Sequence, residues 1–163
     1  MTPRPKQAGP LPPKQRTAGR HAGFDPVFER GRALHRAGQL DEAEAAYRQA
    51  LAADPASPPI NAALGELFLQ RKAYPAAIAA FEASVAGEPD NAEYLNNLGF
   101  AHMLNFTHEF ALPHLMKAAE LAPRNAMIHA NIARAYGALG RADKGVPWIE
   151  KAVALAPDAP GSG

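Results

Sequence analysis

Apolar and small residues recur along most of this chain in two helical runs separated by a short turn, and the whole pattern then repeats. The prolines Pro55, Pro89, Pro123 and Pro157 recur at one constant interval. The same interval relates the large apolar residues Tyr47, Phe81, Leu115 and Ile149. No insertion or deletion interrupts the pattern. It therefore predicts four helix-turn-helix units, over residues 24–57, 58–91, 92–125 and 126–159.

Two further columns hold small residues in every unit. One column contains Gly31, Gly65, Gly99 and Ala133, and the other contains Ala43, Ala77, Ala111 and Gly145. We expect the two helices of each unit to approach each other closely where these columns meet. In the fourth unit the alanine and the glycine are exchanged, which keeps the combined volume and fits two residues that touch.

The turn residues are consistent with the same helices. Gly38 and Gly140 supply glycine at a helix C-terminus, where a positive φ is needed. The third unit has Phe106 and Thr107 at this place, so we expect its corner to be distorted. Asp54-Pro55 and Glu88-Pro89 should end the second helices, because proline disfavours helix in the residue before it.

These columns resemble the tetratricopeptide repeat family over residues 24–157, although the family's large aromatic at the fourth position is missing. That position holds Val27, Asn61, Leu95 and His129. The resemblance implies an all-α, right-handed superhelical solenoid. Its first helices would line a concave groove that binds a protein or peptide partner.

Charge and composition separate two end segments from the array. Residues 1–23 carry five basic residues, no acid and several prolines, which predicts a disordered tail with polyproline II character. Within it, Pro10 to Lys14 loosely resembles a ligand for aromatic-lined grooves, and a solvated leader is the plainer interpretation. Residues 160–163 look like a linker. The alanine, arginine, glycine and proline bias is typical of a high-GC bacterial source.

Composition also limits the partners and the location. The net charge of +1 implies no polyanionic partner, and no aromatic residues are interleaved with the basic tail to stack on bases, so no nucleic acid is expected. No stretch approaches the roughly 20 apolar residues of a membrane helix. The N-terminus lacks the apolar core of a secretory signal. These features predict a cytoplasmic protein without membrane contact.

The helical period assigns one face of the first helices to partner binding. The predicted partner-binding residues are Phe28, Arg32, His35, Glu66, Leu69, Asn96, Asn97, Phe100, Met103, Asn131 and Arg134. Four of them, Phe28, Leu69, Phe100 and Met103, have no core partner in this scheme, and gathered exposed apolar residues mark a binding surface. They would suit an amphipathic helix or an extended apolar peptide. The alternative is that they seal gaps between neighbouring helices.

The resemblance adds two expectations about this face. Asn97 and Asn131 look like the asparagines that bind a peptide backbone in some family members, and a structural role is an equal alternative. The carboxylate clamp of chaperone-binding members is excluded, because the places for its cations hold Phe28, Ala63 and Glu93.

No catalytic, metal or cofactor site is predicted. The chain has no cysteine, and His102, His108, His114 and His129 do not form a helical ligand pair at i, i+4. His102 and His129 occupy packing positions. His108-Glu109 begins like a zinc protease motif but fails at Leu112.

The last predicted helix leaves Trp148, Ile149 and Val153 partly uncovered, because a solenoid normally ends in a polar cap. Self-association, a docked partner domain, or a longer chain would each account for this face. The leading function is a protein-interaction adaptor or scaffold. The alternatives are the recognition module of a longer group-transfer enzyme, such as a sulfotransferase or glycosyltransferase, and a self-assembling scaffold.

Overall fold

The computed structural model describes residues 25–156, and this part of the chain contains eight α-helices and no strand. The helices are α1 (Pro26–Arg36), α2 (Leu40–Ala53), α3 (Pro58–Gln70), α4 (Tyr74–Gly87), α5 (Ala92–Leu104), α6 (His108–Leu121), α7 (Ala126–Ala138) and α8 (Ala142–Leu155). The predicted disordered tail and the predicted linker at 160–163 lie outside the described residues.

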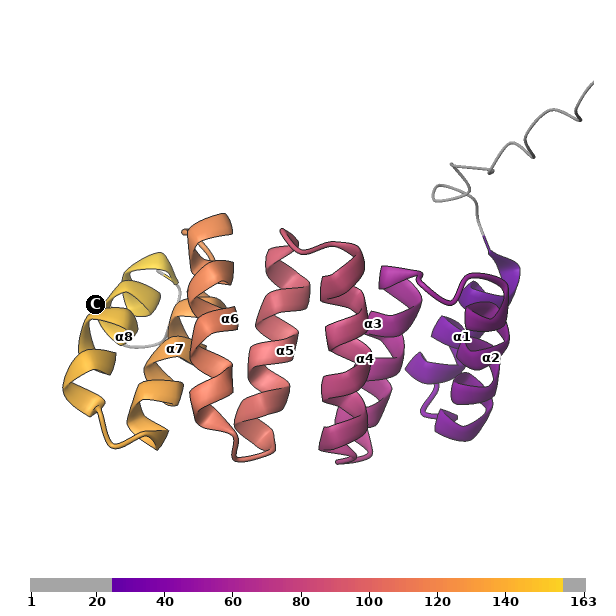
Figure 1. Cartoon of the computed structure of the whole chain (residues 1–163), viewed down its shortest axis with the longest axis horizontal. Coiled ribbons are helices and arrows are strands. Elements are labelled where there is room, and N and C mark those ends of the chain that lie inside the picture. Colours follow the sequence, from indigo (N-terminus) through magenta and orange to yellow (C-terminus); the bar gives the residue numbers. More distant parts are fainter. Residues whose placement is uncertain (1–24, 157–163) are drawn as a thin grey trace, which may run out of the picture.

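The helix bounds repeat with the sequence period. The first residues of α2, α4, α6 and α8 are separated by the same interval as the prolines, and so are those of α3, α5 and α7. Each helix packs against the next one in the chain, and the pairs follow one another along the long axis of the molecule (Figure 1). The prediction of an all-α solenoid is confirmed.

The turns inside the pairs share one geometry. Gly38 and Gly140 have φ values of 77° and 70°, and Lys72 and Phe106 both have a φ of 59°. The expected distortion at Phe106 is wrong, since Phe106 N–H donates to Met103 C=O and Thr107 N–H to His102 C=O, as Gly38 and Gln39 do in the first unit. The corner keeps its shape and places a phenylalanine in the left-handed region, which L side chains rarely adopt.

Side-chain caps begin three of the first helices, and the prolines end second helices as the sequence predicted. Asp25, Asn91 and Asn125 accept hydrogen bonds from the first backbone N–H groups of α1, α5 and α7. Helices α2 and α4 stop at Ala53 and Gly87, one residue before the Asp-Pro and Glu-Pro pairs.

In the first two units, the glycines of the small column lie nearest to the large apolar residue of the second helix. A Cβ on Gly31 would lie 2.6 Å from Cδ1 of Tyr47, and a Cβ on Gly65 would lie 2.6 Å from Cε1 of Phe81. The glycines therefore make room first for the large apolar residue of the second helix.

The expected contact between the small columns does occur in the last two units. A Cβ on Gly99 would lie 2.6 Å from Cγ of Leu115 and 3.2 Å from the Ala111 carbonyl oxygen. In the fourth unit a Cβ on Gly145 would lie 3.0 Å from the Ala133 carbonyl oxygen, which confirms the exchanged pair.

The large apolar column forms the core between successive units. Tyr47 packs in one cluster with Ile60 and Leu64, and Phe81 packs in another with Leu98. Leu115 lies in a third cluster with Ile128 and Ile132. Each unit thus buries the second helix of one pair against the first helix of the next. Among the described helices, none combines the length and apolar character needed to cross a bilayer.

Candidate functional site: the inner row of odd-numbered helices

The predicted partner-binding residues all lie on α1, α3, α5 and α7, which are the first helices of the four pairs. Helix α1 contacts α3, and α5 contacts α7, in addition to the contacts within pairs. We call this set of side chains the inner row: Phe28, Arg32, His35, Glu66, Leu69, Asn96, Asn97, Phe100, Met103, Asn131 and Arg134.

One column of the inner row holds the same place in every unit. Its members, which are separated by the sequence period, are Arg32, Glu66, Phe100 and Arg134. The three charged residues are exposed, and Phe100 is half-buried and belongs to none of the core clusters of the described residues. A ligand lying along this column would contact a cation, an anion, an aromatic ring and a second cation in turn.

The other three apolar members of the inner row are part of the fold. Phe28 packs against the cluster around Tyr47, Leu69 against the cluster around Phe81, and Met103 against the cluster around Leu115. The expectation that these three lack a core partner is wrong. The offset pattern failed here because half-buried side chains at these positions reach across to the neighbouring helix.

His35 links three helices at one end of the inner row. Its Nε2 lies 2.9 Å from Oε1 of Gln70 on α3, and its Nδ1 lies 3.2 Å from the hydroxyl of Tyr47 on α2. An amide oxygen only accepts, so Nε2–H donates to Gln70 and Nδ1 accepts from the Tyr47 hydroxyl. Both ring nitrogens are occupied, which gives His35 a structural role.

The charges at the N-terminal half of the row are unevenly matched. Arg32 pairs with Glu29 at 3.2 Å, and its guanidinium carbon lies 6.0 Å from the centre of the Phe28 ring. Partial desolvation raises the pKa of Glu66, and the nearby Glu93 carboxylate raises it further, while His35 and Arg32 oppose both effects. The region around Glu66 and Glu93 therefore favours a cation.

A buried amide pair joins the C-terminal half of the row. Asn131 Nδ2 on α7 donates to Asn96 Oδ1 on α5 at 2.9 Å, and the two residues are 4% and 8% exposed. This bond engages one amide hydrogen of Asn131 in holding neighbouring units together. Asn97, one residue further on, is half-buried.

The histidines pack against other rings. His102 stacks on His114, with ring centres 5.8 Å apart, and also on Phe110. His129 donates from Nε2 to the Pro123 carbonyl at 2.7 Å. Over residues 25–156, no group of three or more histidine, cysteine, aspartate or glutamate side chains is placed to hold a metal ion.

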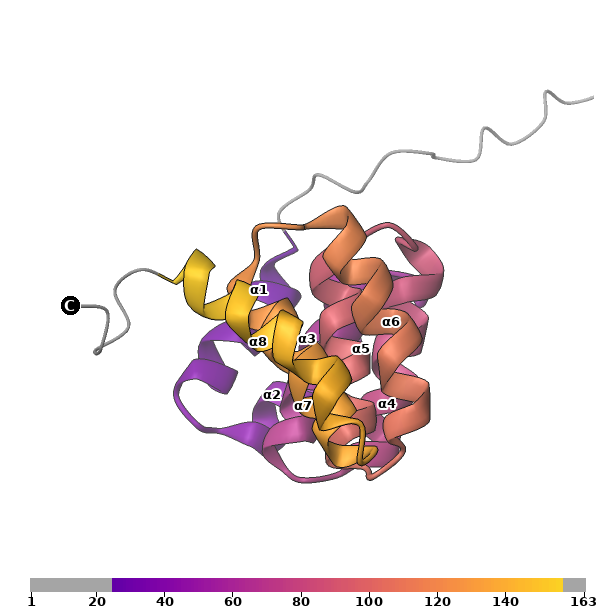
Figure 2. The same cartoon turned by 90° about the vertical axis from the view of Figure 1, so that its left-hand side faces the viewer.

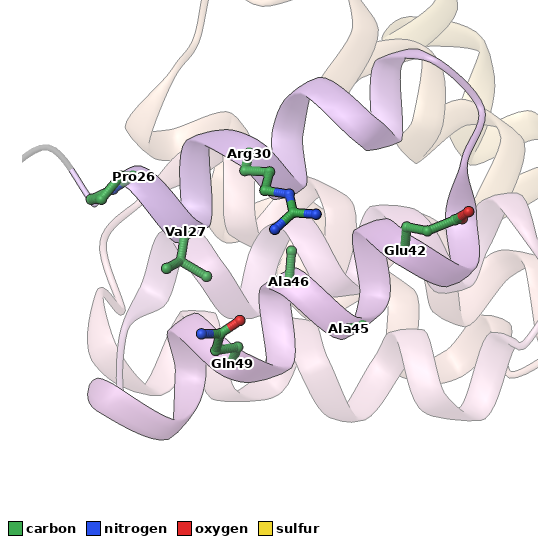
Figure 3. A pocket seen from close by; sticks show the side chains of 7 residues that line it. All are labelled: Pro26, Val27, Arg30, Glu42, Ala45, Ala46 and Gln49. Atoms are coloured by element: carbon green, nitrogen blue, oxygen red, sulfur yellow. The ribbon is translucent and has the colours of Figure 1, made fainter.

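Two hollows lie away from the inner row, and none of the predicted residues lines either one. The first, of about 450 Å³, lies between α1 and α2 on the N-terminal face (Figure 3). It is lined by Pro26, Val27, Arg30, Glu42, Ala45, Ala46 and Gln49. The second follows the turn from α6 to α7, over residues 122–127, and ends at Met127, which is 66% exposed. Sequence reasoning missed both hollows. Arg30 in the first hollow occupies the position that holds Leu64, Leu98 and Ile132 in the later units.

The predicted self-association residues lie on α8 at the C-terminal end. Ile149 is 45% exposed and Val153 is 59% exposed, and Val146 beside them is 49% exposed. Trp148 is half-buried, because its ring stacks on His129 at 5.4 Å and packs against the cluster around Leu115. The open face therefore consists of Val146, Ile149 and Val153.

Comparisons with known proteins agree with this architecture. Two family models, each described as a tetratricopeptide repeat, match residues 34–99 and 128–159. A crystal structure of MamA shares 24% identity and a TM-score of 0.75, covering 83% of this chain and 77% of that one. MamA 41-end from Desulfovibrio magneticus RS-1 shares 22% identity and a TM-score of 0.77, covering 83% and 77%. At these identities the likeness shows the fold. No curated protein matches the chain.

Proposed function

Because the chain belongs to the tetratricopeptide repeat family, whose fold serves protein interaction, we propose that it is a scaffold that binds a peptide or helix along the inner row. The observation that carries this proposal is the column of Arg32, Glu66, Phe100 and Arg134, which runs through all four units without entering the core. A segment lying across the units would contact each of these side chains in turn.

The chemistry of the row defines the segment that would bind. Phe100 offers an aromatic surface for one apolar anchor. The neighbouring carboxylates of Glu66 and Glu93 favour a lysine or arginine of the partner near α3. Arg134 favours an acidic group near α7. The expected ligand is a short segment with a basic residue, an apolar anchor and an acidic residue in that spatial order.

A peptide-display selection against the full chain provides the probe. We expect selected peptides to carry this pattern and to lose at least about tenfold in affinity for Phe100→Asp and for Glu66→Lys, measured by fluorescence anisotropy. The matched control is Phe110→Asp, because Phe110 is an aromatic residue that is 62% exposed on α6, away from the row. Peptides that bind the two phenylalanine variants equally would contradict the assignment of the row.

A second candidate function, self-assembly, is favoured by one separate observation. Ile149 and Val153 are 45% and 59% exposed at the C-terminal end, where the array offers its apolar stacking face to solvent. Light scattering of the full chain over a wide range of concentrations tests this candidate. A mass that stays at one chain throughout would exclude it.

A further inference from the structure

The two ends of the solenoid differ in chemistry, and the C-terminal end is the apolar one. Helix α8 lies across this end and faces the viewer in Figure 2. Its residue Ile149 is 45% exposed, whereas its equivalents in the earlier units, Tyr47, Phe81 and Leu115, are at most 1% exposed. Those equivalents are covered by the first helix of the following unit. The open face on α8 thus continues the repeat–repeat interface that stabilises the rest of the array.

Residues 157–163 offer little apolar side-chain area. Residues 157–163 read PDAPGSG and contain no apolar side chain larger than proline. Burial of Val146, Ile149 and Val153 needs a surface that offers apolar area of its own.

The N-terminal face cannot supply that surface. The column that covers the large apolar residues holds Leu64, Leu98 and Ile132, which are at most 3% exposed, and in the first unit it holds Arg30. Arg30 extends from α1 toward Ala46 across the hollow, whose lining holds the polar Glu42 and Gln49 beside the apolar Pro26, Val27 and Ala45 (Figure 3). Head-to-tail stacking would bury the Arg30 guanidinium against Ile149, which is unfavourable because a buried charge loses its hydration. The first unit thus presents a charged side chain at the position where the later units present leucine or isoleucine.

The open face on α8 is complementary to itself. Val146, Ile149 and Val153 are spaced by three and four residues, the spacing of a seam that packs against another helix. In an antiparallel pair of α8 helices, Val146 of one copy lies opposite Val153 of the other, and the two Ile149 side chains meet near the twofold axis. Both copies then bury the same three residues.

We propose that the apolar end of the solenoid is covered by a second copy of this chain, with α8 against α8 about a twofold axis. This arrangement rests on the proposed self-assembly and specifies its geometry. The contact is isologous, so assembly closes at the dimer and no filament forms. The two polar N-terminal ends, with Arg30, point away from each other.

Cysteine crosslinking tests the geometry directly, because the natural chain has no cysteine. Ile149→Cys should form a covalent dimer under mild oxidation, since residue 149 meets its own copy near the axis. Gln49→Cys, on the N-terminal face, is the matched control and should stay uncrosslinked. Equal crosslinking of both variants, or crosslinking of Gln49→Cys alone, would overturn the proposed contact.

Sedimentation equilibrium of the full chain separates this geometry from self-assembly in general. We expect a monomer–dimer equilibrium whose dissociation constant rises at least about tenfold in Val153→Lys, with an unchanged far-ultraviolet spectrum. Arg30→Leu should allow species larger than the dimer, because both ends are then apolar. A strict monomer would remove self-assembly and this geometry together. Association that resists Val153→Lys, or that is weakened by Arg30→Leu, would overturn the geometry and leave self-assembly in place.

Discussion

At the residue scale, two glycines within helices differ in whether the packing around them leaves room for a side chain. Gly65 lies on α3, where a Cβ would approach Cε1 of Phe81 to 2.6 Å, and an aromatic ring in the core cannot move aside without loss of packing. Gly137 lies on α7 with no neighbouring atom within 4 Å of its Cβ position. The first glycine is required by packing, and the second only weakens its helix.

Substitution of these glycines by alanine should therefore have opposite signs. Gly65→Ala should reduce the free energy of unfolding by about 1–3 kcal/mol through overpacking. Gly137→Ala should increase it by about 0.5–1 kcal/mol, because alanine loses less backbone entropy in a helix. Urea denaturation followed by circular dichroism measures both.

A compensating variant keeps this prediction specific to the Phe81 contact. The fourth unit pairs Ala133 with Ile149 at the equivalent places, so Phe81→Ile should recover part of the stability lost in Gly65→Ala. A double-mutant cycle in which the two effects simply add would show that the steric argument is incorrect.

At the element scale, the ring stack between α5 and α6 makes the stability of the array depend on pH. His102 Nδ1 donates to Thr107 Oγ1 at 2.9 Å, because that hydroxyl donates in turn to the His102 carbonyl. Burial lowers the pKa of His102, and His114 lowers it further. Burial also lowers the pKa of His114, while Glu82 on α4 opposes both shifts. The folded state therefore favours two neutral rings.

The sign of the pH effect follows from these directions. Unfolded histidine has a pKa of about 6.5, above both folded values, so the unfolded chain binds more protons as the pH falls. Well above pH 6.5, the two histidines should not change the free energy of unfolding. As the pH falls through about 6.5 that free energy should decrease, and below the folded-state pKa values the decrease should stay constant. Urea midpoints measured between pH 8 and pH 5, a range of about three units around the histidine pKa, test this.

Two variants assign the effect to this stack. His114→Phe keeps a ring in place and should flatten the pH dependence in the histidine range. Glu82→Gln removes the carboxylate that opposes the shifts and should steepen it. A pH profile that neither variant changes would place the titration elsewhere in the chain.

The helices themselves were the part of this molecule most open to sequence prediction. A constant period, with a proline after each second helix, places the helix ends by local chemistry alone. The packing of half-buried side chains such as Phe28 and Leu69 was not predictable in this way. Their contacts depend on how far the next helix lies, which no spacing within one unit reveals. The prediction of a distorted corner at Phe106 was wrong for a related reason. The two helices impose the shape of the turn, and this overrides the backbone preference of one residue.

At the scale of the whole molecule, the position of a unit in the array determines how much its side chains contribute to stability. Leu115 and Ile149 occupy the same column, yet Leu115 is fully buried and Ile149 is 45% exposed. In a solenoid each unit is stabilised by its own helices and by its immediate neighbours. The last unit of the described chain has a neighbour on one side only, so the same substitution should cost less there.

We therefore expect Leu115→Ala to lower the free energy of unfolding by about 2–5 kcal/mol, and Ile149→Ala by clearly less than about 2 kcal/mol, in dilute protein. If α8 also forms the dimer contact, the cost of Ile149→Ala grows with protein concentration, because self-association adds stability by mass action. The cost of Leu115→Ala should stay constant, since that side chain is already covered within one chain. Thermal denaturation at several concentrations measures both slopes. Equal costs at the lowest concentration would contradict the dependence on position, and it would mean that the end unit is covered by something within the chain itself.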